Sequence, residues 1–260
     1  MYDPNFILNA IDQHRIPILI GFGLAMVLQN IAMVTAVVMT RREGWISIPL
    51  PCTYLWFAHD LGVVARFDVW FTTYDHWFLK LFWVGLLTAF LLELVFLYQA
   101  IAVGGREYLP GGRTRTWAGL VIAGAVATVV LWEYLKQLWG DPLYQAAPAI
   151  TLFVLPVAAT ALILRRRSAV AQLPLIYGCF AAMVVLWWGV TATFYGPFFA
   201  TWQYLTAGIA AFVMLTGVTV LVTRLRNGAA SVGPFGISGQ AASKIDAMAA
   251  PGSPPARFPV

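Results

Sequence analysis

The chain has 260 residues, of which 60% are hydrophobic and 10% are charged, and its formal net charge is +5. An ordinary soluble domain carries about 25% charged residues, so this composition excludes a normal water-soluble fold. The basic balance does not indicate a nucleic-acid partner, because the arginines stand in short clusters between apolar segments. The polar and apolar residues do not alternate as in a transmembrane β-barrel, so we expect an all-α polytopic membrane protein.

Seven apolar segments are long enough to cross about 30 Å of hydrocarbon as α-helices. In chain order they cover residues 16–40, 48–70, 77–103, 116–139, 143–164, 172–196 and 198–223. We therefore predict a seven-transmembrane-helix bundle that forms one membrane domain over residues 16–226. An interfacial N-terminal segment is expected at 1–15. A disordered cytoplasmic tail is expected at 227–260, because this stretch is rich in Gly, Ala, Ser and Pro and cannot bury enough apolar surface.

Arginines follow every second segment, whereas the loops between them are poor in Arg and Lys. By the positive-inside rule, this pattern places the N-terminus outside and the C-terminus in the cytoplasm. Such an orientation needs an odd number of crossings, as seven segments provide. The clustered arginines are Arg41, Arg42, Arg106, Arg113, Arg115, Arg165, Arg166, Arg167, Arg224 and Arg226.

The two cysteines, Cys52 and Cys179, both lie inside apolar segments. Neither belongs to a CxxC motif or to a Cys/His cluster with the spacing of a zinc site. We therefore predict no disulfide and no metal site, and we interpret both cysteines as small packing residues.

Charged residues inside the predicted spans are the main clue to function. A charged side chain at the centre of a bilayer costs about 2.5–3.5 kcal/mol on insertion scales, so each one must face a partner or a cavity. Asp60 lies near the middle of the second segment and Glu93 within about a turn of the middle of the third. If these helices pack antiparallel, both carboxyls can open on one cavity. At about 100° per residue, one face of the second segment carries a polar and aromatic stripe, made of Trp56, His59, Asp60, Val63, Arg66, Phe67 and Trp70.

Ion pairing is an alternative explanation for these charges. Asp60 could pair with His59 or Arg66, and Glu133 is expected to pair with Lys136 three residues further on. Glu93 has no partner within a turn of its own helix. A lone carboxyl in an apolar setting tends to stay protonated, which makes it a proton donor.

Most of the aromatic residues are expected to face lipid or to form interfacial belts. A subset in the second, sixth and seventh segments could instead line a chamber. An aromatic wall stabilises a cation through the quadrupole of its rings, so acids and aromatics together suit carbocation chemistry. The subset contains Trp56, Phe67, Trp187, Trp188, Phe194, Tyr195, Trp202 and Tyr204.

Several motifs within residues 34–105 resemble the integral-membrane terpene cyclases of fungal meroterpenoid and indole-diterpene pathways. They are VMTRREGWISIPL at 38–50, WFAHD at 56–60 and LELVFLY at 92–98. The family has an NxAWE motif in its second helix and a WxxxD motif in its third, so the resemblance places Asp60 at the family's essential Glu and Glu93 at its Asp. Two features depart from the family: Trp56 replaces the Asn of NxAWE, and the segment 212–218 lacks the acid of the family's last helix.

The resemblance implies a metal-independent isomerase or lyase that needs no cofactor and catalyses a non-redox, acid-initiated cyclisation of a prenyl chain. Protonation of an epoxide or alkene would start the reaction. Asp60 would donate the proton, with Glu93 orienting it or acting in its place, and His59 or Glu133 would take the final proton. Side chains expected to contact the substrate are Trp56, Arg66, Phe67, Trp188, Tyr195, Trp202 and Tyr204.

The implied partners are a lipophilic isoprenoid or meroterpenoid substrate, the lipid bilayer, and a prenyltransferase and an epoxidase of the same pathway. We expect the protein in the plasma membrane of a bacterium or the endoplasmic reticulum of a fungus. Two alternatives stay open: a proton-coupled transporter or channel that uses the buried charges as a relay, and a heptahelical sensor or scaffold. The absence of an internal repeat weighs against a transporter, and the absence of a lysine in the last span excludes a retinal protein.

Overall fold

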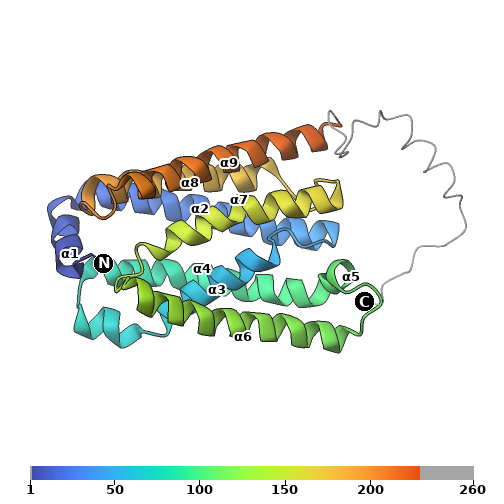
Figure 1. Cartoon of the computed structure of the whole chain (residues 1–260), viewed down its shortest axis with the longest axis horizontal. Helices are drawn as coiled ribbons and strands as arrows, with labels where there is room; N and C mark the ends of the chain where they lie inside the picture. Colours follow the sequence, from blue (N-terminus) through green and yellow to red (C-terminus); the bar gives the residue numbers. More distant parts are fainter. Residues whose placement is uncertain (1, 229–260) are drawn as a thin grey trace, which may run out of the picture.

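The computed structural model describes residues 2–228, and within this range it consists of helices and connecting turns. Six helices are long and apolar enough to cross a membrane, which confirms the prediction of a helical, multi-pass membrane protein. These helices lie side by side along the long axis of the molecule (Figure 1). They are α2 (Arg15–Glu43), α4 (Trp77–Val103), α6 (Thr114–Trp139), α7 (Ala147–Arg166), α8 (Pro174–Phe194) and α9 (Trp202–Arg226). Of the predicted tail, residues 229–260 lie outside the described range.

The predicted interfacial segment forms the short helix α1 (Pro4–Gln13), which lies across one end of the bundle (Figure 1). Asp3 caps it by accepting a hydrogen bond from the Asn5 backbone, and Pro4 fits the first helical position because its missing N–H has no partner there. The Tyr2 hydroxyl donates to Asp141 in the loop before α7. The chain start is therefore fastened to the same end of the bundle.

The segment 48–70 was predicted as one helix, but in the structure it is interrupted. Helix α3 (Leu50–Val64) has 15 residues, which span about 22 Å. A turn and the π-helix η1 (Val69–Thr73) follow it. Helix α3 thus ends inside the bundle, where its last carbonyl groups need donors other than water.

Side chains supply these donors. The indole N–H of Trp70 donates to the Val63 carbonyl at 2.7 Å, and that of Trp83 donates to the Val64 carbonyl at 3.2 Å. The Arg66 guanidinium donates to the Gly62 carbonyl at 3.1 Å. The sequence can therefore end a helix within the apolar interior, and Asp60 lies one turn before this end.

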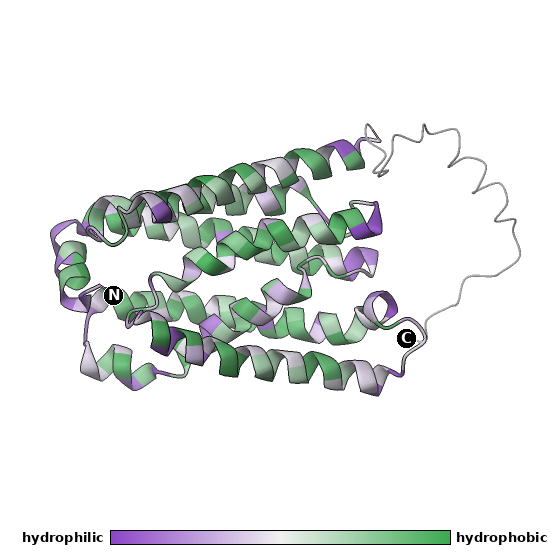
Figure 2. Cartoon of the chain, viewed as in Figure 1, coloured by the Kyte–Doolittle hydropathy of each residue, from purple (hydrophilic) through white to green (hydrophobic). Residues whose placement is uncertain are grey.

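Two groups of packed helices position the interior. Helix α8 packs against α2 and α9, while α3 packs against α4, α6 and α7. The helices are predominantly apolar along their length, and polar residues gather at their ends (Figure 2). Helices α2, α7 and α9 each carry two arginines in their last turn, and these turns lie at the same end of the bundle as the short helix α5 (Gly105–Tyr108) (Figure 1).

Candidate active site

Two acidic side chains meet in the middle of the bundle, an arrangement that the sequence allows only for one rotation of the two helices. Asp60 comes from α3 and Glu93 from α4, and only 4% and 1% of their surfaces are exposed. The Glu93 carboxyl lies within hydrogen-bonding reach of the Asp60 carboxyl, while its Oε2 atom has no partner among residues 2–228. No salt bridge to Lys or Arg is formed by either acid within that range.

His59 is the third polar side chain of this buried group. Its Nδ1 lies 2.6 Å from Asp60 Oδ1, and both side chains are buried. The imidazole packs edge-on against Trp132 and Tyr144, with centroid distances of 6.0 and 5.7 Å. Its Nε2 is buried and makes no hydrogen bond in the described part of the chain. Of the two pairings considered for Asp60, the structure forms the one with His59.

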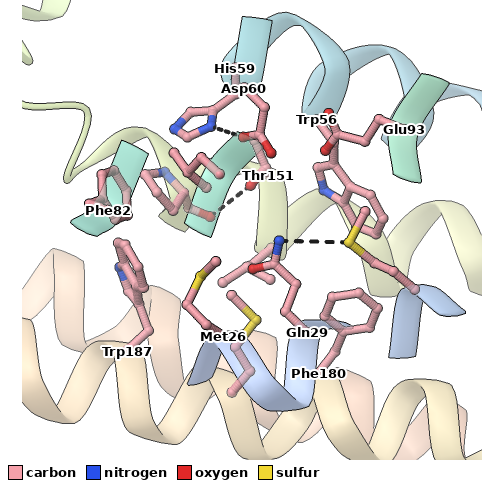
Figure 3. A pocket seen from close by; sticks show the side chains of 15 residues that line it. Met26, Gln29, Trp56, His59, Asp60, Phe82, Glu93, Thr151, Phe180 and Trp187 are labelled. Carbon is pink, nitrogen blue, oxygen red and sulfur yellow. Dashed lines mark hydrogen bonds and ion pairs between the residues drawn. The ribbon is translucent and has the colours of Figure 1, made fainter. Parts of the chain in front are cut away.

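The acids and His59 line a narrow cavity of about 40 Å³. Figure 3 shows His59, Asp60, Trp56 and Glu93 on one side, facing Met26, Gln29, Phe180 and Trp187. The cavity is thus mainly aromatic and thioether-lined around a carboxyl pair. Its lining residues come from α2 (Met26, Gln29, Met33), α3 (Trp56, His59, Asp60), α4 (Phe82, Leu86, Glu93), α7 (Pro148, Thr151, Leu152) and α8 (Phe180, Met183, Trp187).

A second, almost wholly apolar hollow adjoins the cavity between α2 and α4. It has a volume of about 240 Å³ and shares Met26 and Phe82 with the cavity. Leu81 and Val84 on its rim are exposed on the outer surface of the bundle. We call this hollow the lateral groove. Its lining residues are Leu19, Phe22, Gly23, Met26, Phe78, Leu81, Phe82, Val84, Gly85 and Thr88.

Only the first part of the predicted stripe on the second segment lines the cavity. Trp56, His59 and Asp60 face the cavity, but Arg66 and Phe67 lie beyond the end of the helix and do not line it. Phe67 is exposed and stacks on Phe71 at a centroid distance of 4.1 Å. The helical-wheel prediction fails for these two residues because the turn after Val64 changes the direction of the chain.

Glu133 lies outside the cavity and lines a separate polar hollow of about 360 Å³, which Lys136 also lines. Its expected pair with Lys136 is not formed. Arg66 is the ionic partner of Glu133, and Tyr144 donates a hydrogen bond to it at 3.2 Å. The Lys136 ammonium instead lies over the ring of Tyr144. Gly62 permits this arrangement, because a Cβ there would lie 2.8 Å from the Glu133 carboxylate.

The other aromatic residues predicted to contact substrate do not line the cavity either. The Trp188 indole donates to the Tyr204 carbonyl at 2.8 Å, which ties α8 to α9. Tyr195 packs on Phe199, with ring centroids 5.6 Å apart. Trp202 is 71% exposed at the start of α9. These side chains join or end helices, and of the seven predicted contacts only Trp56 is a cavity residue.

Trp187, Phe82, Phe180 and Gln29 are cavity residues that the sequence did not single out as substrate contacts. The sequence places both Trp187 and Trp188 in the wider aromatic subset, but it predicts only Trp188 as a substrate contact. Adjacent helical residues point about 100° apart, so only the rotation of α8 distinguishes them. A polar Gln29 in the middle of an apolar helix was a usable signal for an inward-facing position.

Within residues 2–228, no group of three or more His, Cys, Asp and Glu side chains could hold a metal ion. Cys52 and Cys179 are both buried and unpaired with each other. The chain matches no protein-family model, no curated protein and no solved structure.

Proposed function

We propose that the protein is a membrane-embedded acid catalyst of the terpene cyclase type, which cyclises a prenyl chain on a lipophilic substrate without redox chemistry. The observation that carries this proposal is the contact between Asp60 and Glu93 on the wall of an aromatic-lined cavity. Two carboxylates in one buried site repel each other, so the pair is most stable with one shared proton. A neutral carboxyl in an apolar pocket is an acid able to protonate a weak base.

The surrounding rings suit the intermediate that such protonation creates. Trp56 and Phe180 pack at a centroid distance of 5.3 Å, and Phe82 and Trp187 pack at 6.3 Å. Aromatic faces within about 6 Å of a cation stabilise it by ≈ 0.5–2 kcal/mol each, more where water is excluded. The methionine side chains between the rings are flexible and adapt to a folded hydrocarbon chain.

The lateral groove accounts for the lipophilic nature of the proposed substrate. Its rim is exposed on the bundle surface that hydrocarbon would cover, and its inner end meets the cavity at Met26 and Phe82. A prenyl chain dissolved in the bilayer could therefore reach the carboxyl pair without passing through water.

In the proposed reaction, Asp60 delivers the proton that it shares with Glu93 to an epoxide oxygen or an alkene carbon. The resulting cation is attacked by the π electrons of neighbouring double bonds, which forms the rings. A base then removes a proton next to the last cationic carbon, and the electrons of that C–H bond become a new double bond. We assign this step to His59, because it lines the cavity and its buried Nε2 makes no hydrogen bond in the described range.

The proposal includes seven crossings with the N-terminus outside. Helices α2 and α4 both end at the basic end of the bundle (Figure 1), so the chain must return across the bundle between Glu43 and Trp77. Helix α3 and the turns after it make that return. Since arginines mark this end, the positive-inside rule makes it cytoplasmic.

The product provides the direct test. Full-length protein in lipid nanodiscs is incubated with isoprenoid quinols and phenols that carry either a terminal alkene or a terminal epoxide. We expect a product of unchanged mass and altered retention, because one proton enters and one leaves, and incorporation of one deuterium at carbon in D₂O when an alkene is protonated. Native mass spectrometry of the purified protein should show a bound isoprenoid. Failure of every prenyl compound to bind or react, together with proton-coupled flux in proteoliposomes, would favour a transporter instead.

A further inference from the structure

A fourth hollow lies at the basic end of the bundle and shares no lining residue with the cavity of the carboxyl pair. It has a volume of about 530 Å³ and is formed by α5, the end of α7 and the segments after α2 and α7. We call it the arginine hollow. Its lining residues are Trp45, Arg106, Glu107, Arg165, Arg166, Ser168 and Val170.

The floor of the arginine hollow is a fixed ionic cluster. Arg166 is buried, pairs with Glu107 at 2.6 Å and donates to the carbonyls of Ile46 at 2.8 Å and Val170 at 3.2 Å. Its guanidinium is therefore occupied by the protein itself. Arg165 also pairs with Glu107, but about half of its side chain is exposed.

The charges in the arginine hollow do not balance. Three guanidinium groups face one carboxylate, so two positive charges are left over. Arg106 is exposed and forms no salt bridge within residues 2–228. Arg106 and the outward part of Arg165 thus have N–H donors for a ligand, while Glu107 and Arg166 keep Arg165 in place.

Two uncharged side chains of the arginine hollow, Ser168 and Trp45, can also contact a ligand bound by the arginines. The Ser168 hydroxyl accepts a hydrogen bond from the Val170 backbone at 3.1 Å and keeps its own proton to donate. Trp45 is 40% exposed beside Arg166, whose guanidinium carbon lies 5.4 Å from the ring centroid. Exposed tryptophans at helix ends are typical of the headgroup level of a bilayer.

We propose that the arginine hollow binds a phosphate group, and specifically that of an anionic membrane lipid in the leaflet that surrounds this end. Guanidinium forks match the geometry of phosphate oxygens and form two parallel charge-assisted hydrogen bonds with them. Basic pockets at the membrane surface bind anionic headgroups on the same principle. The acyl chains of the lipid would lie along the apolar surface of the bundle. This site is independent of the proposed cyclase activity.

Binding to full-length protein in a zwitterionic detergent provides the test. The probes are phosphatidylglycerol, phosphatidylcholine and inorganic phosphate, and the readouts are native mass spectrometry and the shift in Tm. The test variant is Arg106→Gln/Arg165→Gln, which leaves the Arg166–Glu107 pair intact. The matched control is Arg113→Gln/Arg115→Gln, because both residues are exposed, lie near the same end and do not line the hollow. The single variant Arg106→Gln breaks no salt bridge of the described residues and guards against misfolding.

We expect wild type to prefer phosphatidylglycerol to phosphatidylcholine, and the double test variant to bind it about tenfold more weakly, as expected for loss of one or two charge-assisted hydrogen bonds. The control should stay within about twofold of wild type, since a distant surface charge contributes little. Equal losses in test and control variants, or a wild type that neither prefers phosphatidylglycerol nor binds inorganic phosphate, would overturn the site. Binding of inorganic phosphate with the same dependence on Arg106, but without lipid preference, would keep the phosphate site and overturn its lipid source.

Discussion

Carboxyl groups in two regions of the molecule have different surroundings. At the end of the bundle that carries α1, Glu133 is paired with Arg66, and Asp141 accepts the Tyr2 hydroxyl and three backbone N–H groups. In the middle, Asp60 and Glu93 face each other with only His59 beside them. A carboxylate with a full set of donors stabilises the fold, whereas a pair without a cation keeps a proton available for chemistry.

The largest expected effect comes from the middle pair. Asp60→Asn and Glu93→Gln keep the shape of each side chain but remove the acidic proton, so we expect product formation to fall by about 10²–10⁴-fold, as for loss of a general acid. Tm should change little, because the amide can still hydrogen-bond to the remaining carboxyl. Turnover by both variants at the wild-type rate would contradict the assignment of the acid. Glu133→Gln is the matched control, and its rate should stay close to wild type.

At the end of the bundle that carries α1, the hydrogen bond from the Tyr2 hydroxyl to Asp141 is expected to stabilise the fold. Burial and the negative Asp141 beside it raise the pKa of Tyr2 well above its usual value. Tyr2→Phe removes a charge-assisted hydrogen bond and should lower the free energy of unfolding by about 1.5–3 kcal/mol. Product formation per folded molecule should not change.

The pH dependence of this loss follows from the same shift. A raised pKa in the folded state stabilises the protein below about pH 10, the unfolded value, and this contribution is lost as pH rises above it. The stability gap between wild type and Tyr2→Phe should therefore be constant near neutral pH and shrink above pH 10 in chemical denaturation curves. A gap that widens at high pH would show that the hydroxyl is not held in its neutral form.

The Arg66–Glu133 pair should contribute less. Water reaches both side chains, since they are 39% and 29% exposed, so we expect Glu133→Gln to cost about 1 kcal/mol of stability. In the double variant Arg66→Met/Glu133→Gln the two losses should be less than additive, which a double-mutant cycle on Tm would measure. Strict additivity would mean that the two groups do not interact in the folded protein.

The sequence predicted the two regions unequally well. Periodicity and length were sufficient for α4, whose predicted span 77–103 coincides with the helix, and they placed Asp60 and Glu93 near the middle of their segments. They did not show that the two carboxyls meet, because this depends on the rotation of each helix. Hydropathy could not show that α3 ends at Val64, because the donors that satisfy its carbonyls, Trp70 and Trp83, are themselves apolar enough to continue the segment. For the same reason the sequence assigned Arg66 to the cavity and Lys136 to Glu133.

Helix rotation set the second limit. Trp187 and Trp188 are adjacent residues of the same type, so the sequence alone does not distinguish them. The packing of α8 between α2 and α9 turns Trp187 toward the carboxyl pair. The sequence did not predict the lateral groove, because a glycine such as Gly85 adds nothing to a hydrophobic pattern. The lack of a side chain at Gly85 matters only because Met26 of α2 lies close to it on α4.

The smallest expected effect tests whether substrate reaches Asp60 and Glu93 through the lateral groove. A Cβ at Gly85 would lie 2.7 Å from the terminal methyl group of Met26, so Gly85→Ala must push this flexible side chain toward the junction of groove and cavity. We expect KM for a prenyl substrate to rise about threefold to tenfold, equivalent to about 0.7–1.4 kcal/mol, while kcat stays nearly constant, because chemistry at the acids is untouched. Gly23→Ala is the matched control: it lines the same groove, but its Cβ would meet nothing within 4 Å. Equal effects of the two alanines would show that the substrate reaches Asp60 and Glu93 by another route, and the contrast between the two regions would then rest on the carboxyl pair alone.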